Sequence, residues 1–140
     1  MATRALVFDF GTRKIGVAAA NRESKTTTPL STLPANDGVP EWRDIQALIR
    51  DWEPDVLVVG LPRNTDDSDS TMTARSRVFG RWLAEKSALP VEEIDERFTS
   101  TEAEALLRDQ RRDGMRTRRV RPEDIDRMAA RLMAETWCHP

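Results

Sequence analysis

The segment that most restricts the fold is a short apolar run near the amino terminus that ends in an acidic residue. Ala5 to Phe8 are four consecutive apolar residues without polar alternation, which is typical of a strand covered on both faces in the middle of a sheet. Asp9 follows where that strand emerges, and Gly11 and Gly16 bracket a basic turn before a second apolar strand. The pattern predicts a central strand with a carboxylate at its end and an antiparallel return strand.

Strand and helix signals alternate along the rest of the chain. Thr26 to Leu33 predicts a third, edge-type strand, and Pro40 has the position of a first-turn proline for a helix to about Trp52. The remaining segments are predicted as strands at Asp55–Gly60 and Pro90–Arg97 and helices at Thr71–Ser87, after Thr99 and after Pro122. We therefore expect one α/β domain over residues 1–140, with a five-stranded mixed sheet (an antiparallel hairpin, then parallel strands) flanked by helices.

Composition limits the class of protein. The 140 residues include one cysteine, Cys138, so an internal disulfide is excluded and a reducing compartment is indicated. No leader segment and no apolar run of membrane-spanning length are visible. We expect a soluble, cytoplasmic protein without a membrane partner.

Charge is unevenly distributed, although the net charge is only −2. Seven arginines fall between positions 108 and 121, with Asp109 and Asp113 as the only acidic residues among them. Arginine rather than lysine at every basic position favours contact with phosphate over a merely solvated loop. The cluster consists of Arg108, Arg111, Arg112, Arg116, Arg118, Arg119 and Arg121.

Three acidic segments could meet at one edge of the sheet. Asp9 ends the first strand, Asp95 and Glu96 end the last, and Asp126 lies near the start of the closing helix. Ligands of parallel sheets bind outside the carboxyl ends of the strands. Carboxylates gathered there would repel one another unless a divalent cation balanced them, and hard oxygen ligands select Mg²⁺ or Mn²⁺.

Such a site predicts phosphodiester hydrolysis by two metal ions. We expect Asp9, Asp126 and one residue of the Asp95–Glu96 pair to bind metal. Strand alternation sends one of that pair inward, and this interpretation favours Asp95 over Glu96. Nucleic-acid phosphates are expected to contact basic residues near the same edge, namely Arg13, Lys14, Arg63 and Arg97, together with the arginine cluster.

Four motifs resemble one known family. The segment Val7–Ala18, the Val59–Pro62 turn, the segment Asp95–Ala103 and the segment Ile125–Ala130 are similar, in this order, to the motifs of the YqgF/RuvX family of Holliday-junction-resolvase-like proteins. The resemblance covers essentially the whole chain. It implies a ribonuclease-H-like fold and a cytoplasmic bacterial nuclease that matures the 5′ end of precursor 16S ribosomal RNA. Its acidic positions fall here on Asp9, the Asp95–Glu96 pair and Asp126.

Other functions stay open from the sequence. A Holliday-junction-resolvase-like DNA endonuclease would use the same carboxylates, and a homodimer would suit its branched substrate. A nucleic-acid-binding protein without catalysis would need only the basic residues. An actin-like or sugar-kinase-like ATPase shares the strand–Asp-x-Gly hairpin, but this chain has no second such element.

Overall fold

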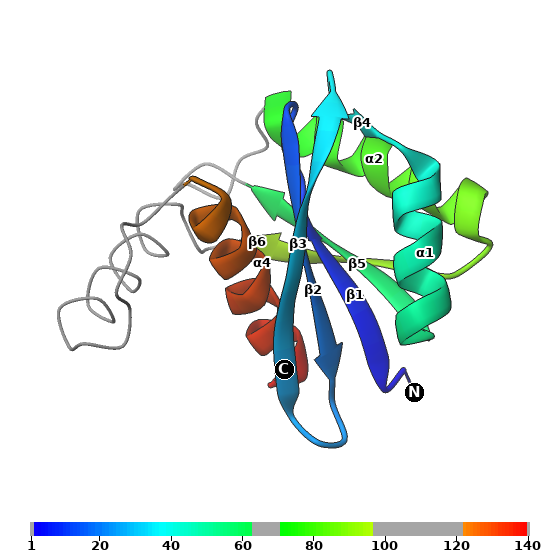
Figure 1. The fold of residues 1–140 in the computed structure, drawn as a ribbon, viewed down its shortest axis with the longest axis vertical. Coiled ribbons are helices and arrows are strands. Elements are labelled where there is room, and N and C mark those ends of the chain that lie inside the picture. Colours follow the sequence, from blue (N-terminus) through cyan, green and yellow to red (C-terminus); the bar gives the residue numbers. More distant parts are fainter. Residues whose placement is uncertain (1, 63–70, 97–121, 140) are drawn as a thin grey trace, which may run out of the picture.

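The structure is a computed structural model that describes residues 2–62, 71–96 and 122–139. Six strands form one sheet in the order β4-β3-β2-β1-β5-β6. The helices pack on its two faces (Figure 1). The elements along the chain are β1 (Arg4–Asp9), β2 (Lys14–Asn21), β3 (Thr26–Asn36), β4 (Val39–Pro40), α1 (Trp42–Trp52), β5 (Val56–Pro62), α2 (Thr71–Ser87), β6 (Val91–Glu96) and α4 (Pro122–Cys138).

Strand β1 lies in the interior of the sheet, as its apolar run predicts. It pairs antiparallel with β2 on one side and parallel with β5 on the other. Strand β6 then continues the parallel part of the sheet beside β5. Ala5 to Phe8 are at most 2% exposed, because both faces of this strand are covered.

Side chains of β1 alternate between two apolar clusters. Ala5 and Val7 belong to the cluster beneath α4, whereas Leu6 and Phe8 belong to the cluster beneath α1 and α2. Figure 1 shows α4 on one side of the sheet and α1 and α2 on the other. The parity of a strand residue, that is, whether its number along the strand is odd or even, therefore tells which helices its side chain faces.

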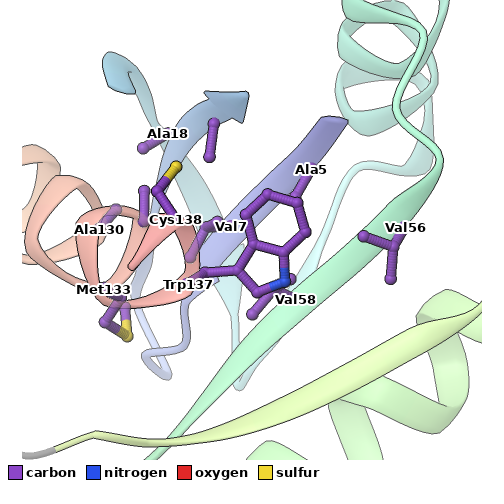
Figure 2. Packing of buried hydrophobic residues seen from close by; sticks show 11 residues of the cluster. Ala5, Val7, Ala18, Val56, Val58, Ala130, Met133, Trp137 and Cys138 are labelled. Atoms are coloured by element: carbon purple, nitrogen blue, oxygen red, sulfur yellow. The ribbon is translucent and has the colours of Figure 1, made fainter. Parts of the chain in front are cut away.

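The carboxyl-terminal end of α4 is fixed to the sheet by Trp137. Its indole is 2% exposed and lies against Ala5 and Val58 in the α4 cluster (Figure 2). Trp137 Nε1 donates a hydrogen bond to Glu92 Oε2 (2.9 Å), and Arg22 Nε donates one to the Trp137 carbonyl (2.9 Å). The Arg22 guanidinium also lies 3.8 Å from the indole centroid, in a cation–π contact. These contacts hold the end of α4 beside the start of β1.

The sheet has one strand more than the five predicted. β4 is only Val39–Pro40, paired antiparallel with Ala35 and Asn36 at the end of a longer β3. Pro40 was predicted to begin the first helix, but it pairs with Ala35, and α1 begins at Trp42 after Glu41 as its N-cap. The bounds predicted for α2, Thr71–Ser87, are confirmed.

Burial on the helices differs from the prediction at five positions. The apolar spacing of the last helix predicts an inward stripe that includes Leu132 and Thr136, but Thr136 is exposed and Leu132 only partly buried, whereas Ala134 and Trp137 face the sheet. From its place near the end of the sequence Cys138 is predicted to lie in a tail, but it is 2% exposed within the α4 cluster. The helical spacing of the neighbouring apolar residues predicts that Trp52 and Val78 pack inward, but they are 41% and 56% exposed. No helix within the described ranges has the length and apolarity to cross a membrane.

Asp55 secures the start of β1 against the start of β5. One carboxylate oxygen accepts hydrogen bonds from the backbone N–H groups of Thr3 and Arg4, both at 3.0 Å. The Arg4 and Thr3 hydrogen bonds lower the pKa of Asp55. A carboxylate whose pKa is lowered by folding stabilises the protein at pH values above its unfolded-state pKa, which is about 3.9. This stabilisation is lost as the pH falls through the pKa of the folded state.

We therefore expect Asp55→Asn to lower the midpoint of urea-induced unfolding at pH 7. The substitution should have little effect at about pH 2.5, a pH below the ordinary pKa range of aspartate. Urea titrations of wild type and variant at the two pH values measure this. Asp51→Asn is the control, because its carboxylate on α1 has only a long ion pair with Arg50, at 3.7 Å. If Asp55→Asn lowered the unfolding midpoint equally at both pH values, the carboxylate charge would not be the source of the stabilisation.

Candidate active site

Asp9 lies at the carboxyl end of β1, on the face of the sheet that α4 covers. It has the parity of Ala5 and Val7, both in the α4 cluster, and it is the last residue of the strand. Its side chain is half-buried. The strand thus leaves a carboxylate partly sheltered from water at the edge where parallel sheets bind ligands.

Both neighbours of Asp9 across the sheet are glycines. Gly16 of β2 is its partner in the antiparallel register. In the parallel register Phe8 pairs with Val59, so the next step places Gly60 of β5 beside Asp9. Because neither glycine has a side chain, the Asp9 carboxylate is flanked by bare backbone where an ion or a phosphate could approach. The sequence analysis did not identify Gly60, since its role depends on the register between β1 and β5.

The two acidic residues at the end of β6 have opposite parity. Val91 packs against the cluster beneath α1 and α2, and Glu93 forms an ion pair with Arg77 of α2 (3.7 Å). Asp95 shares their parity, and its side chain is exposed. Position 96 shares instead the parity of Glu92, which accepts the hydrogen bond from Trp137 of α4. Within β6, position 96 therefore has the parity of the face to which Asp9 belongs, and Asp95 does not.

Helix α4 runs antiparallel to β1 and points its amino-terminal end at the Asp9 edge. Cys138 donates through its thiol to the Asn21 carbonyl (3.6 Å), and Asn21 pairs with Arg4. Twelve helical residues back from Cys138 span about 18 Å, and five strand residues from Arg4 to Asp9 span about 16 Å. Because these two lengths are similar, we expect position 126 near the level of Asp9, one helical turn before Ala130, which is buried against the sheet.

The turn after Asp9 carries two exposed basic residues, Arg13 and Lys14. Gly11 makes this turn possible, because a Cβ at that position would collide with the Lys14 carbonyl oxygen. The turn is held to the end of β3 by hydrogen bonds from Ala35 N–H to the Arg13 carbonyl (2.8 Å) and from Gly38 N–H to the Thr12 carbonyl (2.9 Å). Two of the expected phosphate contacts therefore lie on the loop that follows Asp9.

Several expected site residues lie outside the described residues. These are Arg63, Arg97 and the cluster Arg108, Arg111, Arg112, Arg116, Arg118, Arg119 and Arg121. The structure describes the backbone but not the side chains at positions 96 and 126. Among the side chains that it does describe, no three His, Cys, Asp or Glu residues gather as metal ligands.

The donor chemistry at this edge fits a hard cation. Asp9 supplies carboxylate oxygens next to two glycines, and positions 96 and 126 would add further carboxylates. Mg²⁺ and Mn²⁺ prefer oxygen ligands and keep coordination sites for water and phosphate. His139, the one histidine of the chain, follows the end of α4 nearest Arg4, so imidazole ligation is not part of this arrangement.

Comparison with solved structures identifies the fold. The chain matches a RuvC of T. thermophilus in complex with a Holliday junction substrate, with a TM-score of 0.53 and 12% sequence identity over 93% of this chain and 90% of that one. It matches the yeast mitochondrial Holliday junction resolvase Ydc2 with a TM-score of 0.55 and 14% identity over 97% and 78% of the two chains. The mixed sheet with its helices is thus the ribonuclease-H-like fold of the RuvC-like resolvases, as predicted.

Sequence comparison identifies the family. A protein of Marinobacter nauticus named "Putative pre-16S rRNA nuclease" is 46% identical over 135 residues, which cover 96% of this chain and 92% of the relative. A protein of the same name from Chromohalobacter salexigens is 44% identical over 132 residues, covering 94% and 86%. The family model for RuvX, described as Holliday junction resolvase, matches residues 3–139. The chain therefore belongs to the RuvX family, which confirms the resemblance of its four motifs.

Proposed function

We propose that this protein is a metal-dependent nuclease that hydrolyses phosphodiester bonds of structured nucleic acid, with 5′-end maturation of precursor 16S rRNA as its biological reaction. The names of its relatives and the family model support the reaction class. The structural observation that carries the proposal is the position of Asp9. Its carboxylate lies between two glycines at the carboxyl end of the central strand, on the face covered by α4.

We assign metal binding to Asp9, Asp126 and position 96. The sequence analysis favoured Asp95 over Glu96, but strand parity supports the opposite choice. Asp95 shares the face of Val91 and Glu93, against α2, while position 96 shares the face of Asp9. Three carboxylates in this volume would disfavour their own ionisation, and a divalent cation reverses that effect.

In the proposed reaction the protein mainly positions its substrate. Mg²⁺ or Mn²⁺, when bound in a pair, supplies an activated water and stabilises the departing 3′ oxygen. Asp9 fixes one side of the site from a rigid strand end. Arg13 and Lys14, on the loop that follows, can contact backbone phosphates and orient the strand. Arg63, Arg97 and the arginine cluster are proposed to extend this phosphate contact.

Cleavage assays on two substrates test the proposal. Purified protein is incubated with precursor 16S rRNA and with a four-way DNA junction, each in Mn²⁺, Mg²⁺ or EDTA. We expect metal-dependent cleavage of the RNA near its mature 5′ end. Cleavage of the junction alone would instead favour a resolvase, for which a homodimer would present two sites. Binding to both substrates without cleavage in any metal would favour a non-catalytic binding protein.

A further inference from the structure

An apolar pocket opens at the same edge of the sheet as Asp9, on its opposite face. Its volume is about 300 Å³, and its lining residues come from β4 with the turn before it, from α2 and from the residue after β1. Figure 1 shows where these elements lie in the fold. Phe10, the residue directly after Asp9, forms part of its wall. The other residues that matter for the argument are Val39, Arg75, Val78, Phe79 and Trp82.

Three aromatic rings line this pocket, of which those of Phe10 and Trp82 are partly buried and that of Phe79 is buried, and two exposed valines form its rim. The Phe10 ring lies 5.2 Å from the Phe79 ring, and the Phe79 ring lies 6.0 Å from that of Trp82 in a stacked arrangement. Val39 and Val78 at the rim are each 56% exposed, more than any other large apolar residue in the described ranges. Surfaces of this kind on soluble proteins mark binding sites.

The two charged residues of the pocket lining, Arg75 and Asp37, pair with each other, and further basic residues lie nearby. Arg75 projects from α2 into its rim, where its guanidinium donates to the carbonyl and to the carboxylate of Asp37 (2.9 and 2.7 Å). Arg13 and Lys14 lie on the turn that is hydrogen-bonded to Ala35 and Gly38, and Gly38 lies against the Phe10 ring. Aromatic side chains close to exposed basic residues, here Arg13 and Lys14, are features with which proteins bind unpaired nucleotides.

We infer that this pocket binds an unpaired nucleobase of the nucleic-acid substrate, from a nucleotide next to the one whose phosphate lies at Asp9. The inference rests on the proposed function and adds a second point of recognition to it. Asp9 and Phe10 are consecutive residues with opposite parity. One strand end therefore presents a carboxylate to the phosphate on one face and an aromatic ring to a base on the other. The pocket would select substrates with unpaired nucleotides near the cleavage site.

The experiment measures binding in EDTA, so that it does not depend on cleavage. A single-stranded RNA oligonucleotide is compared with a series in which one base at a time is replaced by an abasic residue. We expect one position at which base removal weakens binding to the wild type by about 5- to 100-fold, the scale of one stacked base. The Val78→Asp variant should bind the intact oligonucleotide more weakly by a similar factor. Removal of the base at the sensitive position should not weaken binding to this variant any further.

Two variants control for charge and folding. Val78→Asn changes the shape of the pocket rim without adding charge. The Val78 side chain is mostly exposed, so both substitutions should leave the protein folded. Trp52→Asp places the same charge at an exposed apolar position on α1, and this variant should bind RNA as the wild type does.

An abasic series without any sensitive position would overturn the inference, even if the protein still binds and cleaves RNA. A dimer that Val78→Asp dissociates, together with an insensitive series, would assign the pocket to a second copy of the chain. Loss of all nucleic-acid binding and cleavage by the wild type would instead remove the proposed function itself.

Discussion

Asp9→Asn is expected to reduce Mn²⁺-dependent cleavage by roughly a thousandfold, the upper range for removal of one strong electrostatic contact to a transition state. The substitution keeps the size of the side chain but removes the charge at the end of β1, where Gly16 and Gly60 leave the carboxylate accessible. Single-turnover cleavage of precursor 16S rRNA measures the loss.

Folding and binding should survive this change. Asp9 ends its strand and is only half-buried, so its replacement leaves the apolar core of β1 intact. Circular dichroism and a gel shift in EDTA should match the wild type. Asp51→Asn on α1 serves as the matched control and should cleave normally. Full cleavage by Asp9→Asn would exclude Asp9 from the mechanism.

The second large effect is expected at the end of β6, where two neighbouring acids are assigned different roles. Glu96→Gln should lower cleavage by about a hundredfold. Asp95→Asn should change it by less than about threefold, since its face of β6 is that of Val91 and Glu93, against α2. Both variants are assayed under the conditions used for Asp9→Asn.

This pair is informative because the two residues differ by one position and by one face of the sheet. A large loss with Asp95→Asn and a small loss with Glu96→Gln would reverse the assignment and restore the choice made from sequence. Equal, large losses would indicate that both carboxylates act at the site. The parity of β6 would then not decide which of them binds metal.

Much of the fold could be predicted because its signals are local. The uninterrupted apolar runs at Ala5–Phe8 and Val56–Val59 identify strands buried on both faces. The bounds of α2 were also predicted. The two-residue strand β4 could not be predicted, because Pro40 before a helical pattern is also typical of a first helical turn, and only its pairing with Ala35 decides.

The inward face of α4 was misjudged for a different reason. The small size of Ala130 predicts a close approach to the sheet, which its burial confirms, but Ala134 carries little apolar surface and a sequence pattern gives it less weight than Leu132. In the structure both alanines let the helix lie close to the sheet, and Trp137 and Cys138 complete the buried stripe. The helical period puts position 126, one turn before Ala130, on the same face of α4 as that alanine.

For the candidate site, too, the parts that depend on local sequence features could be predicted and the parts that depend on the packing of distant elements could not. Asp9 and Asp126 could be proposed from the sequence, because a strand end and a helix start are local features. The sequence favoured Asp95 over Glu96 without a sound basis, because the choice depends on which helix covers which face of β6. The apolar pocket beside Phe10 was also not predicted, since it forms only where β4, α2 and the end of β1 meet.

The central claim is that Asp9 and Asp126, from opposite ends of the chain, bind the same divalent cation. Electron paramagnetic resonance titration of Mn²⁺ into the wild type, Asp9→Asn and Asp126→Asn tests it without reference to catalysis, with Asp51→Asn as the control. We expect each site variant to weaken Mn²⁺ binding by about tenfold or more, the scale at which ligand-shell changes alter metal affinity, while the control binds normally. Unchanged Mn²⁺ affinity in Asp126→Asn, with the protein folded, would contradict the shared site.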